Sequence, residues 1–277
     1  MICRRSIAPA GCWRSCSLRR IRRLPLARDT RDALDALTRQ VRSKRSRRGK
    51  VVEASRLWDA QRDVVSVVRQ RLGAMLADPR CMYCEYNEPT DVEHFWPKSE
   101  FPEKAFVWEN HLLACSACNS NHKRTRFPMD GDSPLLLDPT DGVTDPLDHL
   151  QLAPTTGRYL GVTRRGEESV EVFGLQRDFL VERRRHAFAR LLMDICQWVR
   201  ARTDGNRTRA DYVLGLLRGQ PHVSVLRDFV RLVDRGDVAA VAHSMRGAGR
   251  GDSADDLESC VRHLVAYPEI RAWCDDL

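Results

Sequence analysis

The sequence predicts an α+β protein that is mainly helical, in which a small zinc-stabilised module is set between helical segments. Apolar residues recur at three- and four-residue steps in long segments before residue 80 and after residue 175. Two Cys-x-x-Cys pairs bracket the stretch between these helical segments. Short β-like runs separated by Pro, Gly and Asp fill the interval from residue 133 to residue 175.

The chain has 277 residues, which is long enough to bury a core without a disulfide or an oligomer. Its formal net charge of +8 is concentrated near the N-terminus, where residues 1–50 hold 16 Lys and Arg against 3 Asp. Such an Arg-rich field attracts polyanions, of which nucleic acid is the commonest, but a solvated basic face has the same composition. Charge alone leaves both interpretations open.

No apolar run approaches the ~18 residues of a membrane span, and residues 1–27 lack the continuous apolar stretch of a secretory signal. We therefore expect a cytoplasmic protein without a membrane partner. The Arg-rich start also has the composition of a mitochondrial transit peptide, but 41 Arg against 5 Lys in the whole chain indicates a general bias instead. Since residues 1–27 show no helical or strand period, we expect a basic, disordered arm.

Residues 28–80 are expected to form a helical N-terminal region. Apolar spacing predicts one helix over residues 30–41, then a basic loop, then one long helix over residues 53–77. Asp78-Pro79 ends this pattern just before the first cysteine pair.

Residues 133–277 are expected to form a hairpin-rich connector and a helical C-terminal region. The connector contains a turn signal at Thr156-Gly157 and three β-like runs, HLQLAP, RYLGV and SVEVFGL. A long amphipathic helix is predicted over residues 180–199. Shorter helices are predicted over residues 213–217, 223–233 and 255–265.

The strongest local signal is a set of four cysteines, Cys81, Cys84, Cys115 and Cys118. Two Cys-x-x-Cys turns present four thiolates to one ion, which is the donor set of a tetrahedral structural zinc. The other six cysteines are scattered, so a reduced compartment with one metal site fits better than a disulfide scaffold. A closed all-thiolate site has no position for a substrate, so any chemistry must come from other residues.

The 30 residues between the two pairs exceed the ~15–20 of a simple zinc ribbon, so they must hold structure of their own. They include DVEHFWPKS and WENHLLA, and the second pair continues as CSACNSNHKRT. The arrangement of Glu93-His94, Asn110 and Asn119 resembles the HNH nuclease family, the ββα-metal fold, in its four-cysteine form. This resemblance implies a nuclease module over residues 81–132 in which these four residues are catalytic.

Cleavage of a phosphodiester requires an activated water, a cation that neutralises developing charge, and a fixed in-line geometry. Glu93 and Asn119 offer oxygen atoms, which suit magnesium or manganese better than zinc. His122 is a further candidate ligand of this divalent ion, and Asp91 is a weaker substitute for Glu93. His94 points to the side of an extended strand opposite to Glu93, and its imidazole can take a proton from water near neutral pH.

The remaining predictions concern neighbouring residues. Asn110 is expected to accept a hydrogen bond from the His94 ring and so to fix its tautomer. Nucleic-acid phosphates are expected to meet four cations, Lys98, Lys123, Arg124 and Arg126. Two departures from the family pattern stand out, because Glu replaces the commoner Asp before the histidine and His111 replaces the usual Leu after Asn110.

More narrowly, the stretch from residue 18 to residue 200 resembles the PtuB nucleases of Septu and retron-associated anti-phage systems. That resemblance implies an ABC/SMC-like ATPase partner (PtuA-like), and ATP use would belong to the partner because this sequence has no Walker motif. The expected function is a metal-dependent HNH endonuclease acting in anti-phage defence. The alternative is a non-catalytic zinc-finger module that binds nucleic acid, which has no use for Glu93-His94 beside Asn119. The choice between DNA and RNA cannot be read from residues that handle phosphates.

Overall fold

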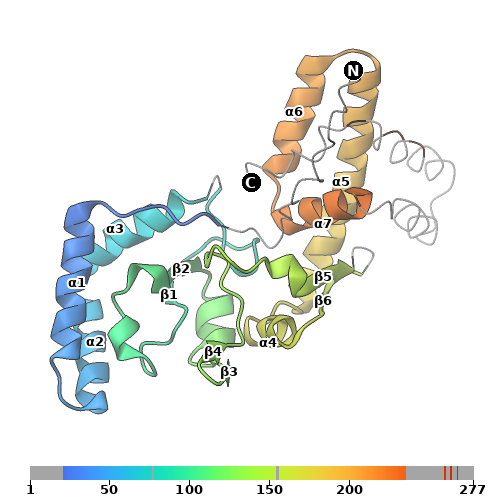
Figure 1. The fold of residues 1–277 in the computed structure, drawn as a ribbon. Coiled ribbons are helices and arrows are strands. Elements are labelled where there is room, and N and C mark those ends of the chain that lie inside the picture. The colour runs from blue at the N-terminus through green and yellow to red at the C-terminus, as the bar shows by residue number, and fades with distance from the viewer. Residues whose placement is uncertain are drawn as a thin grey trace, which may run out of the picture.

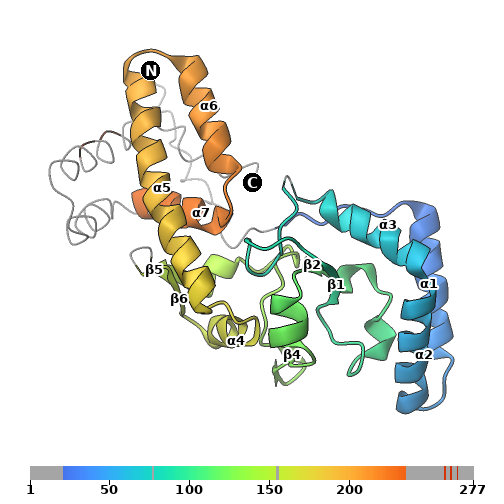
Figure 2. The same cartoon turned by 180° about the vertical axis from the view of Figure 1, so that it is seen from behind.

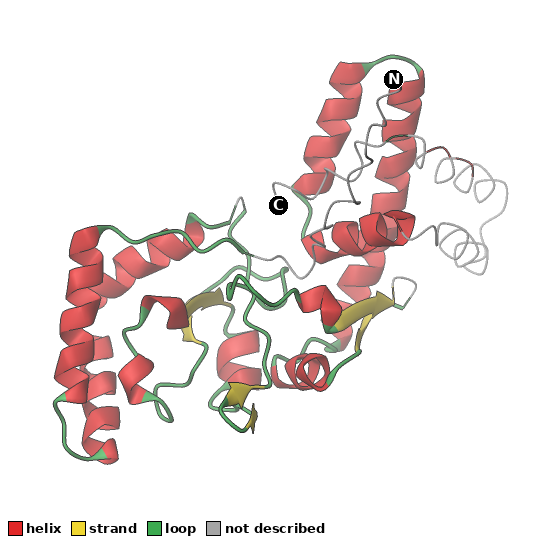
Figure 3. Ribbon diagram, in the orientation of Figure 1, coloured by secondary structure: helices red, strands yellow, loops and turns green. Residues whose placement is uncertain are grey.

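The computed structural model describes residues 21–76, 78–153 and 156–234, together with Ser259, His263 and Tyr267. Helices α1 to α3 lie at one end, the β1–β2 hairpin in the middle and helices α5 to α7 at the other end (Figure 1), as the view from behind also shows (Figure 2). Within these ranges the strands form three two-stranded antiparallel sheets (Figure 3). The mainly helical α+β fold class is confirmed. None of the described helices is long and apolar enough to cross a membrane.

The N-terminal region contains three helices, α1 (Arg28–Arg42), α2 (Arg47–Ala60) and α3 (Arg62–Gly73). Helix α1 confirms the first predicted helix. Helix α2 begins inside the expected basic loop, because the Ser46 hydroxyl accepts a hydrogen bond from the Gly49 amide at 3.0 Å and caps it.

The single long helix predicted over residues 53–77 is wrong. The chain leaves the helical conformation at Gln61, with φ −96° and ψ 49°. This break allows α2 to pack on α1 while α3 packs on the β1–β2 hairpin. A straight helix would carry its second half away from the hairpin.

The expected disordered arm differs from the structure over residues 21–27, and residues 1–20 lie outside the described part. Ile21 and Leu26 are buried in the core. The Arg23 guanidinium donates hydrogen bonds to the carbonyls of Trp108 and His111 at 2.9 and 3.1 Å. This segment is therefore fixed against the loop that precedes β2.

The central module is built on a hairpin of β1 (Asp91–His94) and β2 (His111–Ala114). The two strands are antiparallel, with Glu93 opposite Leu112 and His94 opposite His111. The connecting loop holds two short 3₁₀ helices, η1 (Pro102–Lys104) and η2 (Trp108–Asn110). After β2 comes the π-helical segment η3 (Ala117–Lys123).

In the connector, the small strands β3 (Met129–Asp130) and β4 (Ser133–Pro134) precede helix η4 (Pro146–Asp148) and the hairpin of β5 (Leu150–Ala153) with β6 (Arg158–Gly161). The β5–β6 hairpin confirms two of the three predicted runs.

The third run, SVEVFGL, is not a strand, because it lies mostly in helix α4 (Arg164–Val172). The Thr163 hydroxyl caps this helix by accepting from the Gly166 amide at 3.2 Å. Ser169 and Val172, three residues apart, form its buried face.

The C-terminal region consists of α5 (Asp178–Thr203), α6 (Arg207–Arg218) and α7 (Val223–Asp234). These helices confirm the predicted long helix and the next two shorter ones. The helix expected over residues 255–265 lies outside the described residues, apart from Ser259 and His263.

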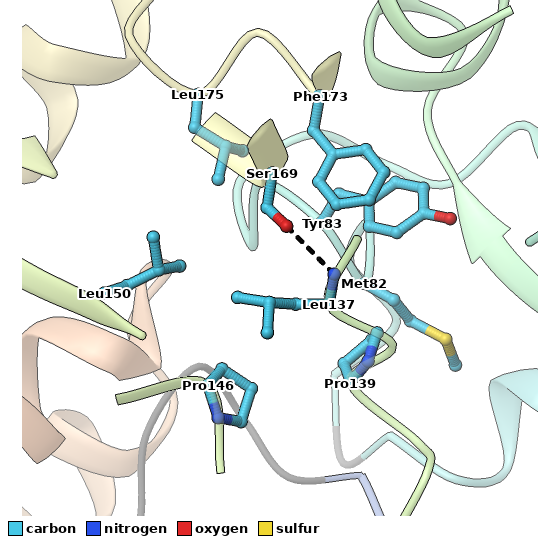
Figure 4. A pocket seen from close by; sticks show the side chains of 9 residues that line it. All are labelled: Met82, Tyr83, Leu137, Pro139, Pro146, Leu150, Ser169, Phe173 and Leu175. Atoms are coloured by element: carbon cyan, nitrogen blue, oxygen red, sulfur yellow. Dashed lines mark hydrogen bonds between the residues drawn. The ribbon is translucent and has the colours of Figure 1, made fainter. Parts of the chain in front are cut away.

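The first cysteine pair and the connector share an apolar core (Figure 4). The rings of Tyr83 and Phe173 stack with their centroids 3.9 Å apart, and the Leu137 amide donates to the Ser169 hydroxyl at 2.9 Å. The remaining space is about 10 Å³, which is no more than one water molecule occupies. This packing holds the central module against the C-terminal half.

Candidate metal centre and catalytic cleft

The four predicted cysteines lie together and are buried, with their sulfur atoms all within 4.8 Å of one another. The Cys84 and Cys115 sulfurs are 3.9 Å apart, far longer than the ~2.05 Å of a disulfide bond. A tetrahedron with Zn–S bonds of ~2.3 Å has edges of about 3.8 Å. The cluster therefore fits one zinc ion.

Local backbone structure explains how each pair turns toward the ion. In the first pair, the Glu85 amide donates to the Cys81 carbonyl at 2.9 Å, and Glu85 takes a left-handed conformation with φ 57°. The second pair lies between the end of β2 and η3, where the Asn119 amide donates to the Cys115 carbonyl at 3.0 Å. Two tight turns thus bring distant segments to one point.

Two side chains donate hydrogen bonds to sulfur atoms of the cluster. The Asn87 amide donates to the Cys115 sulfur at 3.4 Å, and the Arg177 guanidinium donates to the Cys118 sulfur at 3.2 Å. Burial raises the pKa of the Cys81 thiol, whereas the hydrogen bond from Cys118 and those from the other cysteines lower the pKa of Cys115. A zinc ion would displace the shared protons, and Arg177 would offset part of the resulting negative charge.

The structure also brings Asp91 and Asn119 together. The Asn119 side-chain amide donates to Asp91 Oδ2 at 2.9 Å, and the Ser120 hydroxyl lies 3.2 Å from the same oxygen. The Asn119 side-chain oxygen remains available as a ligand. Asp91 is half-buried and faces the same side of β1 as Glu93.

Glu93 is more deeply buried than Asp91, and it forms an ion pair with Lys123 that the sequence did not predict. Its carboxylate is 3% exposed and pairs with the Lys123 ammonium at 2.6 Å. Lys123 is fully buried and also donates to the His94 carbonyl at 3.0 Å. Burial raises the pKa of Glu93, and the Lys123 charge opposes this shift. Lys123 is therefore inside the module, and its predicted contact with nucleic-acid phosphates is not supported.

The His94 imidazole is held by a backbone carbonyl rather than by Asn110. His94 Nε2 lies 3.0 Å from the Ala105 carbonyl oxygen, so Nε2 carries the proton and Nδ1 carries the lone pair. Burial lowers the pKa of His94 well below 6.5, so the ring is neutral at pH 7. A neutral imidazole with a free Nδ1 is the form that can accept a proton.

His111, the departure from the family pattern, shares this carbonyl. Its Nε2 lies 2.9 Å from the Ala105 oxygen, and burial lowers its pKa to about 4. Its Nδ1 is buried without a hydrogen-bond partner. The Trp58 ring packs against both histidines, with its centroid 4.3 Å from that of His94.

Asn110 fixes the loop between the strands. Its side-chain oxygen accepts from the Trp96 amide at 2.7 Å, and its nitrogen donates to the Trp96 and Lys104 carbonyls. The expected hydrogen bond between Asn110 and the His94 ring is thus wrong. Asn110 still acts on His94 indirectly. It holds the Lys104 carbonyl, and the carbonyl of the next residue, Ala105, accepts a hydrogen bond from the His94 imidazole.

The hairpin, η3 and helices α2 and α3 together line a cleft of about 750 Å³. Its floor contains Asp91, Glu93, His94 and Asn119, and four cations surround it: Arg62, Arg69, Lys98 and Arg124. Burial lowers the pKa of Lys98, which lies over the Trp58 ring. The cleft thus combines oxygen atoms that could hold a divalent ion, a neutral imidazole and cations.

Two predicted residues lie elsewhere. The space beside Gly174 is filled by the His122 ring, and His122 is not part of the cleft lining. Arg126 is also absent from the lining and pairs with Glu171 on α4. The structure does not bring either residue to the candidate site.

Sequence reasoning missed the residues that α2 and α3 contribute to the cleft, among them Trp58, Arg62 and Ser66. They precede the first cysteine, and no motif links them to the hairpin. The four-residue spacing of Arg62 and Ser66 indicates a shared helix face, but it does not say what that face contacts.

Comparisons with known proteins agree with this geometry. Residues 81–125 match the family described as HNH endonuclease. The chain therefore carries an HNH endonuclease domain, and the resemblance to this family is confirmed.

Two relatives narrow the comparison. The chain is 29% identical over 136 residues to the Septu protein PtuB of Bacillus mycoides (strain KBAB4), with 38% of this chain and 45% of the relative covered. It is 30% identical over 112 residues to the Septu protein PtuB of Bacillus thuringiensis, with 38% of this chain and 40% of the relative covered. The chain thus spans less than half the length of these curated relatives, and the similarity to PtuB is distant. No solved structure matches the chain.

Proposed function

We propose that this protein is a metal-dependent HNH endonuclease that hydrolyses phosphodiester bonds in nucleic acid. The observation that carries the proposal is the cleft itself, in which the acidic residues of β1 and Asn119 lie beside a neutral histidine and are surrounded by cations. Acidic groups on the floor alone would repel a phosphate. A divalent ion held by these groups would offset their charge and allow a phosphate to approach the floor.

In this proposal, Glu93 and Asn119 hold a magnesium or manganese ion, and Asp91 lies close enough to Asn119 to assist. When bound, the ion stabilises the negative charge that develops on the scissile phosphate. His94 Nδ1 accepts the proton of the attacking water, while the Ala105 carbonyl holds Nε2–H in place. Lys98 and Arg124 bind phosphate oxygens from the edges of the cleft.

The zinc ion is proposed to be structural, because all four cysteines are buried and leave no open position. The alternative, a zinc finger that only binds nucleic acid, accounts for the cysteines and the cations. It does not account for a neutral, backbone-oriented imidazole beside Asp91 and Asn119.

We further propose a role in anti-phage defence, supported by the names of the two relatives, both Septu proteins. In this role, the proposed partner is an ABC/SMC-like ATPase that restrains or triggers the nuclease. A cytoplasmic location suits both assignments, since phage nucleic acid and reduced thiols are found there.

The test is incubation of the purified chain, with and without a co-expressed ATPase, with plasmid, single-stranded DNA and total RNA in magnesium or manganese. We expect cleavage of at least one substrate that EDTA stops and that His94→Ala lacks. Zinc-loaded protein that cleaves none of them in either metal, alone or with the ATPase, contradicts the proposal. Cleavage that survives EDTA contradicts its metal dependence.

A further inference from the structure

The cleft has two walls, and only one belongs to the HNH domain. Asp91, Asn119 and Arg124 come from the segment over residues 81–125, whereas Arg62 and Ser66 come from α3. Arg62, Ser66 and Arg69 follow at four- and three-residue steps, which places them on one face of the helix. That face is turned toward the candidate catalytic residues.

The two arginines on this face differ in their contacts with the protein. Arg69 donates to the carbonyls of Pro89 and Thr90 at 2.9 and 2.5 Å, which ties α3 to the segment just before β1. Arg62 is exposed and has no carboxylate or hydrogen-bond partner among the described residues. The wall is thus fixed in position, and one of its cations is left for a ligand.

The opposite wall has a matching feature at Arg124. Its side chain lines the cleft, and its backbone takes φ 53° and ψ −114°, a conformation that favours glycine. A strained backbone conformation at a residue whose side chain lines the cleft points to a functional role for that side chain. Free cations on both walls and a catalytic floor between them match a phosphate backbone that continues on both sides of the bond to be cut.

We propose that α3 is the second wall of a nucleic-acid cleft, where Arg62 and the Ser66 hydroxyl bind backbone phosphates of the strand that is cleaved. The proposal rests on the proposed nuclease function and extends the substrate contacts beyond the HNH domain. Both groups donate hydrogen bonds, and neither lies in a motif that reads bases. The contact is therefore independent of sequence.

Binding is measured with full-length protein carrying His94→Ala, so that the probes stay intact. Fluorescence anisotropy with labelled single-stranded DNA, duplex DNA and single-stranded RNA, in magnesium and at a series of salt concentrations, gives the affinity and its salt dependence. Adding Arg62→Ala should weaken binding about tenfold at low salt and reduce the slope of log K against log salt by about 0.7–0.9. Arg62→Glu should weaken binding further, and Ser66→Ala should weaken it less.

The matched control is Arg39→Ala, which removes an exposed arginine of α1 that does not line the cleft. It should leave both affinity and slope unchanged. In protein that keeps His94, Arg62→Ala should raise KM for cleavage with little change in kcat, because a backbone contact is present in substrate and transition state alike.

The outcomes separate this proposal from the nuclease function. Cleavage with KM and salt slope unaffected by Arg62→Ala and Arg62→Glu overturns the second wall alone. Binding that depends on Arg62, without cleavage by the unmodified chain either alone or with the ATPase, overturns the nuclease and leaves the wall standing. Failure to bind any of the three probes overturns both.

Discussion

The cysteine cluster and the catalytic cleft are built on one hairpin and differ in nearly every chemical respect. The cluster joins the segment before β1 to the segment after β2, and all four of its sulfur donors are buried. The cleft opens beside β1, mixes carboxylates, an amide and an imidazole, and is surrounded by cations. The closed site can hold backbone segments together, whereas the open one can admit a phosphate and a water.

The two sites also differ in how strongly other protein groups already hold the candidate metal-binding atoms. Asn87 and Arg177 donate to sulfurs that can still meet an ion. Glu93, in contrast, is already paired with Lys123 inside the module. A divalent ion proposed for the cleft would compete with the Lys123 ammonium for this carboxylate, so we expect it to bind more weakly and exchange more readily than the zinc.

The largest expected effect comes from breaking the closed site. Cys118→Ser removes one thiolate from the proposed structural zinc site, and zinc binding contributes roughly 10–16 kcal/mol in small zinc-binding peptides. We expect loss of zinc and unfolding of the central module, measured by elemental analysis and thermal circular dichroism. Cys196→Ser, which changes a buried cysteine outside the cluster, should keep the zinc. A Cys118→Ser protein that keeps its zinc would show that the cluster is not the metal site, and one that loses zinc with unchanged stability would show that the ion is not structural.

The next largest effect is on catalysis in the open site. His94→Ala removes the proposed base, so cleavage should fall by ~10²–10⁴-fold while zinc content and nucleic-acid affinity are kept. His111→Leu is the matched control, because it removes the other imidazole on the Ala105 carbonyl and should retain most of the activity. If His94→Ala cleaves as well as the unmodified protein while EDTA stops both, the base lies elsewhere, and His111 becomes the first candidate.

A third prediction concerns the buried ion pair between Lys123 and Glu93. Lys123→Met leaves the Glu93 carboxylate buried without its partner, which should lower the free energy of unfolding by about 3–5 kcal/mol. The double variant Lys123→Met/Glu93→Gln should recover much of this loss, because neither charge remains. Urea unfolding measures both. A change below ~1 kcal/mol with weakened nucleic-acid binding would return Lys123 to the surface role that the sequence suggested.

The sequence predicted what depends on short spacing. The four cysteines, the pair Glu93-His94 and Asn119 all belong to compact motifs, and the structure brings them into two adjacent sites. It did not predict the break at Gln61, because the apolar residues on both sides keep the same helical phase while the helix axis changes direction.

Burial and long-range contacts account for the other differences. Lys123 follows the last cysteine like an exposed helix residue, yet its ammonium is the only described group in an ion pair with Glu93. The α3 wall depends on a contact between Arg69 and the backbone 20 positions further along the chain. Neither feature leaves a local pattern, because each is decided by tertiary packing.

The smallest expected effect is the most discriminating, because stability and binding should move in opposite directions. Arg124→Gly relieves a backbone at φ 53° and ψ −114° and should raise the free energy of unfolding by about 1 kcal/mol, after the entropy of the added glycine is subtracted. The same change removes a cation from the cleft and should weaken nucleic-acid binding and reduce its salt slope by about one contact. Arg124→Ala is the control, since it removes the cation but keeps the strain, so binding should fall without any gain in stability. Arg124→Gly protein that binds as tightly as the unmodified chain would exclude Arg124 from the contact surface, whereas a loss of stability would show that no strain is stored there.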